Sequence, residues 1–553
     1  MDMQRAFLAI LLSFLILVGY QYLFVPVQPV VPTESNQHVT AVPQSSAQSE
    51  TTATTAPPTP AAVVPTVALD STARDITVET PLYKAIFFEQ GGGLKSFILK
   101  KYRQARDKNS PPVELITVSS NPAEWPMTFT VDGGVAAGLP LFKAKETAIS
   151  LNQGDASLLL QAELANGLHI ERKLIFYADS YLIDSNCTVT NKGTAPAQVH
   201  PTLSMSNGPL HSGGAASSLF SGPAVYVNRQ LHEISAKELS KGPLSFQGEV
   251  SWAAHMDSYF MLSLLPKKNS GSAITVMAID EKKIRTVLTN GAIELAPGDA
   301  KVFAHEGYFG PKKMVYLKQA GYDLEEAINL GWFGVLAKPM LWLLNFFHDI
   351  FGNYGIAIIL LTCVVKGAFW PITHKGMKSM KNMQKIQPKV AKLREKHKDD
   401  PVKMNQEMMA MYKTYKVNPI GGCLPMFIQI PFFFALYKVL MAAIELRHAP
   451  FMLWMHDLSA PDRLMLGFDI PWLHGIPVLT LLMGGTMFLQ QKMSPTTADP
   501  QQAKMMQMMP VIFTVMFVNF ASGLVLYWFV SNLLSILQQQ LINRQTATAA
   551  TPN

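Results

Sequence analysis

NYGIAIILLTCVVKGAFWP, residues Asn353 to Pro371, is an apolar run that carries a single full charge, Lys366, in its second half. A helix of this run is roughly 28 Å long at about 1.5 Å per residue, close to the thickness of the bilayer hydrocarbon. Lys366 then lies within about 10 Å of the end at Pro371. It can lift its ammonium to the interface along its apolar stem, or it can face a wet cavity inside the protein. Thr362 lies one turn earlier on the same helical face, so the two residues form a short polar stripe.

The composition places the chain among membrane proteins. Of its 553 residues, 48% are hydrophobic and 15% are charged, and the mean hydropathy is +0.15. A purely soluble protein is less apolar and more highly charged. Cys363 and Cys423 lie in apolar runs, so Cys187 has no suitable disulfide partner. The sequence contains no H-E-x-x-H, nucleophile elbow or cysteine cluster, and it therefore predicts no metal site, no cofactor and no enzyme.

The N-terminal region predicts a membrane anchor followed by a tether. Residues 6–25 read AFLAILLSFLILVGYQYLFV, which is closer in length to a full span than to the core of a signal peptide, and prolines follow where a cleavage site needs small residues. We therefore expect residues 1–25 to be a retained anchor rather than a cleaved signal. Residues 26–70 are rich in Pro, Thr, Ser, Ala and Gln and nearly uncharged, as flexible linkers are.

Residues 71–330 predict a large β domain. Short runs of alternating polarity, such as LHIERKLIFY at residues 168–177, are separated by turn residues. Asn166-Gly167 and Asn290-Gly291 match two-residue hairpin turns. The pattern favours an antiparallel fold of two packed sheets. Outside a membrane, a domain of this kind is more often a binding or scaffolding module than an enzyme.

Residues 331–352, GWFGVLAKPMLWLLNFFHDIFG, predict a helix that lies in the membrane surface. Aromatic and leucine side chains alternate there with Lys338, Pro339, His348 and Asp349, a mixture typical of interfacial helices. The alternative, a helix that crosses the bilayer, would leave only a turn before the run at Asn353.

The segment after Pro371 is the most basic in the chain. Between Ile372 and Ile420, twelve Lys and Arg residues outnumber four acidic ones, and this surplus of +8 exceeds the net +7 of the whole chain. The positive-inside rule makes the segment cytoplasmic, which places Lys366 in the inner leaflet. Its pattern predicts a helical hairpin at residues 373–420, with Asp400 as N-cap and Pro401 as the first residue of the second helix.

Methionines form soft apolar stripes along both halves of this hairpin, among them Met377, Met380 and Met408. They either pack the two helices against each other, which is the more common role, or form a surface that contacts nascent apolar segments. The sequence leaves both interpretations open.

Four further apolar runs cover residues 422–444, 474–491, 505–520 and 523–541. The loop between the first two has two arginines against four acidic residues, and the next loop has two lysines against one aspartate. These alternating signs, with the N-terminal anchor, predict six transmembrane helices with both termini in the cytoplasm. None of the runs has an acidic residue in its core, which argues against the carboxylate proton relay of a pump.

Polar residues recur inside the apolar runs. They include Gln429, Thr486 and Asn519, and at every fourth position of the last run they are Tyr527, Ser531 and Ser535. Singly, each is the kind of residue that hydrogen-bonds a neighbouring helix. Together with Thr362 and Lys366 they can line a hydrated groove.

Four stretches resemble the YidC-type membrane protein insertases of Gram-negative bacteria: YKVNPIGGCLPMFIQIPFFFALY (415–437), LWMHDLSAPD (453–462), QKMSPTT (491–497) and SGLVLYWFVSNLLSILQQQLI (522–542). The likeness covers nearly the whole chain. It implies an inner-membrane protein with a periplasmic β-supersandwich domain and a five-span core at residues 353–545. It also implies an insertase and chaperone that inserts and folds other membrane proteins through a hydrophilic inner-leaflet groove, alone or with the Sec translocon, without hydrolysing nucleotide.

The resemblance also assigns roles to individual residues. The groove cation of the family is usually arginine, and Lys366 stands at the matching position, so the charge is kept while the planar guanidinium fork is lost. The matching polar groove positions are Thr362, Gln429 and Tyr527, and Ser531 joins them by its spacing. The side chains expected to contact a sliding client helix are Phe433 and Trp528.

The expected partners follow from the same resemblance. They are nascent inner-membrane proteins, the Sec translocon with its accessory subunits, and membrane lipids, with no sequence-specific nucleic acid. Residues 546–553 predict a short disordered tail without basic residues, so ribosome docking would fall to the cytoplasmic loops. Two rival functions are a solute transporter or channel with Lys366 as an anion site, and a sugar-processing β domain. The lack of internal repeats weighs against the transporter.

Overall fold

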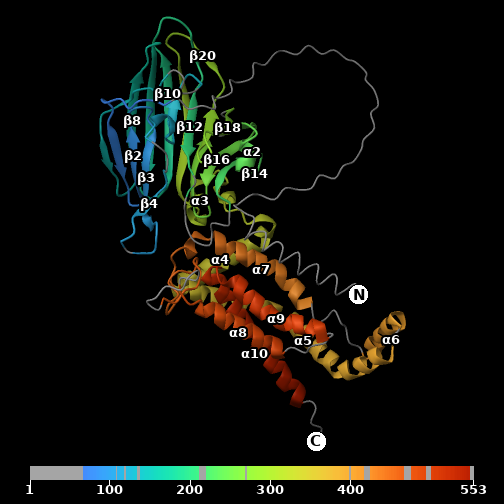
Figure 1. Cartoon of the computed structure of the whole chain (residues 1–553). Helices are drawn as coiled ribbons and strands as arrows, with labels where there is room; N and C mark the ends of the chain where they lie inside the picture. Colours follow the sequence, from blue (N-terminus) through green and yellow to red (C-terminus); the bar gives the residue numbers. More distant parts are fainter. Residues whose placement is uncertain are drawn as a thin grey trace, which may run out of the picture.

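The computed structural model describes residues 66–107, 109–116, 120–133, 138–208, 210, 220–267, 271–397, 400–415, 424–465, 475–493 and 500–548. The predicted N-terminal anchor and nearly all of the predicted tether lie outside these residues. The strands gather in one body and helices α4 to α10 in another, with α6 beside the far half of α5 and away from the remaining helices (Figure 1).

The largest sheet of the described chain has nine strands. Their order is β14 (Gln230–Glu233), β13 (Gly222–Val227), β16 (Val250–Met256), β17 (Phe260–Pro266), β21 (Ala300–Pro311), β10 (Leu182–Asn191), β9 (Leu168–Tyr177), β8 (Asp155–Glu163) and β6 (Lys143–Ala144). All neighbours in it pair antiparallel.

Two five-stranded sheets and a short ribbon complete the β domain. The first sheet has the order β4 (Pro112–Glu114), β3 (Leu94–Arg103), β2 (Tyr83–Phe88), β1 (Asp75–Glu79) and β7 (Ala148–Ser150). The second has the order β15 (Leu244–Phe246), β18 (Ala273–Ala278), β19 (Ile284–Thr289), β12 (Thr202–Asn207) and β5 (Thr128–Thr130). The ribbon pairs β11 (Ala197–Val199) with β20 (Ile293–Leu295).

Both five-stranded sheets pack against the same face of the nine-stranded sheet. Phe97 of the first sheet lies 5.6 Å from Phe309 of β21, ring centroid to centroid. Thr286 of the second sheet hydrogen-bonds His255 of β16. His255 is paired through Leu262 with Phe309, and directly paired residues point to one side of a sheet. The prediction of two packed layers is therefore confirmed, with the second layer divided into two sheets.

The two predicted hairpin turns have different outcomes. Gly167 adopts a φ of 82° between the paired strands β8 and β9, so a hairpin is confirmed there. The predicted two-residue turn is wrong, because the Leu164 N–H donates to the Leu168 carbonyl and leaves a loop of three residues, 165–167. The hairpin predicted at Asn290-Gly291 is wrong, because β19 and β20 belong to different sheets. Asn290 is instead buried, and its amide oxygen accepts a hydrogen bond from His305 Nε2 at 3.0 Å. The dipeptide therefore marks the passage of the chain from one sheet to another.

The described helices follow the predicted apolar runs. The α-helices are α2 (Ala236–Leu239), α3 (Met314–Ala320), α4 (Gly334–Phe351), α5 (Tyr354–Lys396), α6 (Pro401–Thr414), α7 (Leu424–Ala442), α8 (Val478–Met493), α9 (Pro500–Phe517) and α10 (Ser522–Thr548). Short 3₁₀ turns are η1 (Pro122–Glu124), η3 (Leu324–Ala327), η4 (Gly331–Phe333) and η6 (Ile444–Leu446). Helix α4 packs against α5 and α7, while α10 packs against α5 and α8.

Helix α5 begins where expected and continues beyond the expected end. Asn353 caps it by accepting hydrogen bonds from the backbone N–H groups of Gly355 and Ile356. The sequence predicted that the apolar helix ends at Pro371 and that a separate basic helix follows. This prediction is wrong, because α5 is continuous through Pro371. Proline removes one backbone donor from a helix. Side chains also bond to the carbonyls next to the proline: Thr373 Oγ1 donates to the Phe369 carbonyl and Gln538 Nε2 to the Trp370 carbonyl.

Length and composition single out one stretch of the described helices, Tyr354–Met383, as suited to cross a membrane, and Gln429–Ala442 and Gln507–Phe517 are shorter apolar stretches.

The predicted N-cap at Asp400 is confirmed, since its carboxylate accepts a hydrogen bond from the Lys403 N–H and Pro401 opens α6. Helix α10 extends to Thr548. Residues 546–548, Thr-Ala-Thr, are thus helical rather than disordered, although threonine has a low helix propensity. Residues 549–553 of the predicted tail lie outside the described residues.

Asp462 holds the start of α8 to the preceding loop. The carboxylate is buried and accepts hydrogen bonds from the N–H groups of Leu479 (2.5 Å) and Thr480 (3.2 Å). It also accepts one from the indole Nε1 of Trp454 at 2.6 Å. A carboxylate at a helix N-terminus satisfies donors that have no partner within the helix and interacts favourably with the helix dipole.

Asp462→Ala is expected to lower the free energy of unfolding by about 2–3 kcal/mol, because it leaves two buried backbone N–H groups and the half-buried Trp454 indole without their acceptor. Thermal unfolding of the purified full-length protein in detergent measures the change. Asp349→Ala is the matched control, since the Asp349 side chain is 80% exposed, and a surface change of this kind shifts stability by about 0.5 kcal/mol at most. Equal shifts for the two variants would contradict the capping role.

Candidate functional site

A polar cluster lies where α5, α7 and α10 meet. Lys366 of α5 donates from Nζ to Ser535 Oγ of α10 at 3.0 Å and to Gln429 Oε1 of α7 at 3.4 Å. The lysine side chain therefore bonds to neighbouring helices rather than reaching along its own helix toward an end. Three segments separated by many residues in the sequence meet at this one ammonium group.

The amide of Gln429 extends the cluster along α10. Its Nε2 lies 3.4 Å from Ser531 Oγ and 3.5 Å from the Tyr527 hydroxyl. Ser535 Oγ in turn donates to the Ser531 carbonyl at 2.9 Å. Tyr527, Ser531 and Ser535 are all buried and recur at the four-residue spacing of one helical face. The structure thus brings Lys366, Gln429, Tyr527 and Ser531 together.

The cluster holds a cation without a counter-ion among the described residues. The acceptors of Lys366 are a hydroxyl and an amide oxygen, both neutral, and none of the carboxylates that the structure describes forms an ion pair with it. Removing an ammonium from water without a paired charge is costly. The site is therefore electrostatically favourable for water or for an incoming negative group.

Thr362 does not join this cluster. Its side chain is fully buried, and its hydroxyl donates to the Ile358 carbonyl of the same helix at 2.6 Å. Threonine hydroxyls commonly bond back to the carbonyl four residues earlier. The face shared with Lys366 was predicted correctly, but the hydroxyl is already occupied within α5.

Aromatic side chains close the seam between α7 and α10. The ring centroids of Phe433 and Trp528 are 5.3 Å apart, in an edge-to-face arrangement. Trp528 also meets Phe517 of α9 at 5.7 Å and the adjacent Tyr527 at 6.3 Å. The two residues predicted to contact a client thus contact each other in this conformation, and they lie beside the polar cluster.

A second polar pair, which the sequence reasoning missed, lies on the Pro371 side of Lys366. Gln538 Nε2 is 2.8 Å from Thr373 Oγ1, and it also donates to the Trp370 carbonyl. The sequence carried a usable signal, because Gln538 lies three residues after Ser535 and so continues the polar face of α10. Ser535 was among the polar residues expected to line a groove by its spacing from Tyr527 and Ser531, and it accepts a hydrogen bond from Lys366.

The methionines of the basic segment are divided between two environments. Met383 and Ile386 of α5 are buried with Tyr412 of α6 packed against them. Met377, Met380 and Met408 are only half-buried. Contact between the two helices therefore rests on a small cluster, and the three predicted methionines keep accessible surface.

No group of three or more His, Cys, Asp or Glu side chains in the described ranges is placed to hold a metal ion. The chemistry available at the Lys366 cluster is hydrogen bonding and charge attraction. These suit the binding of a polar or acidic segment.

Sequence comparisons match both halves of the chain. A family model described as the YidC periplasmic domain matches residues 75–343, and a model described as the 60Kd inner membrane protein matches residues 346–549. A membrane protein insertase YidC of Nitratidesulfovibrio vulgaris is 40% identical over 557 residues, covering 99% of this chain and 100% of its own length. One of Pelobacter propionicus is 38% identical over 548 residues, covering 98% of this chain and 99% of its own.

Among solved structures, a crystal structure of an active YidC insertase with its first transmembrane domain resolved is 19% identical. The match covers 86% of this chain and 93% of that one, with a TM-score of 0.36.

Proposed function

The chain belongs to the YidC family of membrane protein insertases, and we propose that it inserts and folds inner-membrane proteins through a hydrophilic groove centred on Lys366 and open to the inner leaflet. The observation that carries this proposal is the ammonium of Lys366 held between three helices by neutral oxygen atoms. The groove works without nucleotide hydrolysis and without a cofactor, and the protein acts alone or beside the Sec translocon.

The groove shortens the distance that a polar client segment must cross without water. In hydrocarbon each unpaired backbone group costs several kcal/mol. Hydroxyl and amide groups at Gln429, Tyr527 and Ser531 replace part of the lost hydration, and Lys366 attracts acidic residues of the client. The remaining dry passage is roughly one leaflet, about half of the 30 Å hydrocarbon core.

The apolar part of the client leaves along α7 and α10. Each methylene group that moves from water into lipid contributes about 0.8 kcal/mol, so insertion needs no other source of free energy. Phe433 and Trp528 pack against each other beside the cluster, and a client helix that separates them replaces one apolar contact by another. The contact between Phe433 and Trp528 is therefore the proposed exit.

The proposed topology has six spans with both termini in the cytoplasm, α4 in the membrane surface and the β domain in the periplasm. Trp332, Val335, Trp342 and Ile350 of the η4–α4 segment are exposed, which suits burial among lipid headgroups. The basic parts of α5 and α6 form a cytoplasmic hairpin that meets the ribosome and nascent chains. In this proposal the β domain binds or holds partners and is not a catalyst.

A photocrosslinking amino acid at Phe433 or Trp528 is expected to capture a ribosome-arrested nascent membrane segment, because both side chains line the proposed exit. The same probe at Trp342, which is exposed on α4, is the matched control for random encounters in the lipid. Capture at the two seam positions should exceed capture at Trp342 by several-fold. Equal capture at all three, or none at the seam, would contradict the proposed path.

A further inference from the structure

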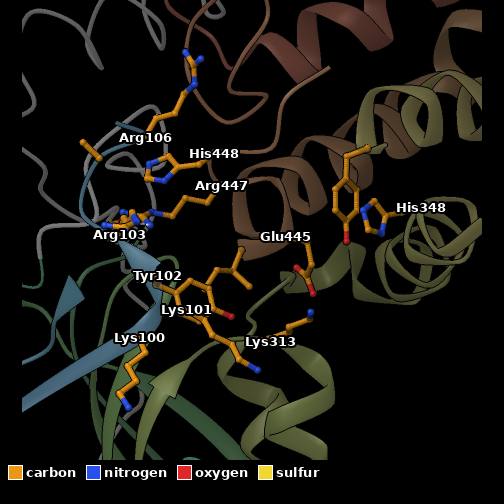
Figure 2. Close-up of a pocket in the computed structure, with 13 residues that line it drawn as sticks. Lys100, Lys101, Tyr102, Arg103, Arg106, Lys313, His348, Glu445, Arg447 and His448 are labelled. Atoms are coloured by element: carbon orange, nitrogen blue, oxygen red, sulfur yellow. Dashed lines mark hydrogen bonds between the residues drawn. The ribbon is translucent and has the colours of Figure 1, made fainter. Parts of the chain in front are cut away.

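A second site lies where the β domain meets the helices, away from the Lys366 cluster. It is a pocket of about 430 Å³, lined by the end of β3 and the loop after it, the start of α3, the junction of α4 and α5, and η6 with the residues after it. Figure 2 shows the charged side chains that surround it. Its volume falls within the range of small-molecule pockets, about 300–1,000 Å³.

The lining of this pocket is strongly basic. Six permanent cations face one carboxylate, Glu445, so the formal surplus is +5, and the cations are Lys100, Lys101, Arg103, Arg106, Lys313 and Arg447. Burial, together with the neighbouring Arg447, lowers the pKa of His448, so this imidazole is mostly neutral at pH 7. The positive charge therefore comes from the lysines and arginines.

Three of the cations are already engaged by the protein. Lys100 pairs with Glu79 at 2.7 Å. Arg103 donates to the Ser110 carbonyl at 2.7 Å. Arg447 donates to two backbone carbonyls of the loop after β3, those of Arg103 at 2.8 Å and Gln104 at 3.0 Å. It also lies over the ring of Phe260, so an arginine of the helical body pins the basic loop of the β domain in place.

The other three cations are available to a ligand. No described side chain forms a hydrogen bond or an ion pair with the side-chain nitrogens of Lys101, Arg106 or Lys313. The side chain of Lys313 points toward Glu445 (Figure 2), and no ion pair joins the two. Burial raises the pKa of Glu445, the one carboxylate that lines the pocket.

In the topology proposed above, the pocket lies at the level of the membrane surface. Tyr354 contributes to its lining and is also the first residue of the stretch suited to cross the bilayer. His348, in the last turn of α4, contributes as well. Polar headgroups occupy the layer just outside the hydrocarbon core, within a total thickness of about 40–45 Å. A lipid phosphate at that level reaches the pocket without leaving its leaflet.

We propose that this pocket binds the phosphate group of an anionic phospholipid headgroup and thereby couples the β domain to the surrounding lipid. Phosphate is the chemistry that a cluster of unpaired lysine and arginine side chains recognises, and basic pockets beside membrane helices hold anionic headgroups in this way. The inference does not depend on the Lys366 groove, since no residue is shared between the two sites.

Native mass spectrometry of the full-length protein tests the proposal, with phosphatidylglycerol or phosphatidylcholine titrated into the detergent. The wild-type protein should retain phosphatidylglycerol in preference to phosphatidylcholine. Replacing the three available cations together should weaken phosphatidylglycerol binding by about tenfold to a hundredfold, because each cation near a membrane surface contributes roughly a factor of five. The substitutions are Lys101→Gln, Arg106→Gln and Lys313→Gln.

Two matched variants separate a binding site from a general charge effect. The first removes three exposed lysines of the β domain that do not line the pocket, by the substitutions Lys145→Gln, Lys173→Gln and Lys301→Gln, and it should bind like the wild type. The second keeps the charges, by the substitutions Lys101→Arg, Arg106→Lys and Lys313→Arg, and it should retain most of the binding.

An added arm with excess inorganic phosphate distinguishes a lipid from a soluble phosphate source. Retention of phosphatidylglycerol in the presence of phosphate supports the lipid assignment. Complete displacement by phosphate would overturn it, since a free phosphate compound would then be the better ligand. Equal phosphatidylglycerol binding by the pocket variant and the exposed-lysine variant would overturn the site itself.

Discussion

Lys366→Ala is expected to reduce insertion of a client with an acidic translocated tail by about tenfold, whereas Lys366→Arg should retain insertion. Two opposite charges about 4 Å apart attract by about 4 kcal/mol at an effective dielectric constant of 20, and desolvation offsets much of that gain. A net contribution of about 1.4 kcal/mol corresponds to a factor of ten. Protease mapping of the client in cells depleted of the wild-type protein measures the effect.

The control is a second lysine on a neighbouring helix. Lys438 of α7 is half-buried and takes no part in the polar cluster, so Lys438→Ala should leave insertion unchanged. A client with a neutral tail should depend much less on Lys366 than the acidic one. Equal activity of Lys366→Ala, Lys366→Arg and the wild type on both clients would contradict the electrostatic role.

Thiol labelling adds a test of hydration at the same site. In a chain without its native cysteines, Lys366→Cys should react with a water-soluble thiol reagent, because the cluster would admit water. Thr362→Cys should react poorly, because this side chain is fully buried against its own helix. Two unreactive cysteines would show a dry site, and a lysine that merely reaches the interface would then be the better interpretation.

Deletion of residues 375–416 is expected to abolish insertion, while deletion of the β domain should leave it largely intact. The first deletion removes a cationic surplus of +8, more than the net +7 of the whole chain. It keeps Lys366, Thr373 and the partners of both on α7 and α10. Loss of activity with the membrane part still folded would therefore assign client or ribosome capture to the basic segment. Insertion assays with the same two clients measure both variants.

The structure sets the ends of the β-domain deletion. Strand β21 runs to Pro311 and pairs with both β10 and β17, so a cut at Ala300 would leave an unpaired strand. Removal of residues 75–311 takes out all the described strands together. Strong loss of insertion in this variant, with activity retained after deletion of residues 375–416, would show that the β domain rather than the basic segment carries the function.

Several features were predictable because short-range physics decides them. The start of α5 at Asn353 and of α6 at Asp400-Pro401 follows from side chains that cap backbone donors a few residues away. The polar face of α10 follows from a repeat of four residues. The two-layer β domain follows from alternation along each strand. In each case the cause lies within about one helical turn or one strand of the residue concerned.

Other features depended on contacts between distant segments. Sequence spacing placed Thr362 beside Lys366, but only the structure shows that its hydroxyl is occupied by Ile358 while Ser535 and Gln429 hold the lysine. Pro371 predicted a helix end, but α5 is continuous through it. Only the structure shows that Gln538 of α10 donates to the Trp370 carbonyl next to the proline.

The basic pocket was the least predictable feature of all. Its side chains come from the loop after β3, from Lys313 and from the region around Glu445, segments more than a hundred residues apart. Within each segment, the local sequence does not distinguish these lysines and arginines from ordinary surface residues. The sequence by itself determined the helices, the strands and the polar faces, because local periodicity and capping act over a few residues. Only the tertiary structure decided which polar groups meet, because hydrogen bonds and uncompensated charges depend on distances that no local pattern encodes.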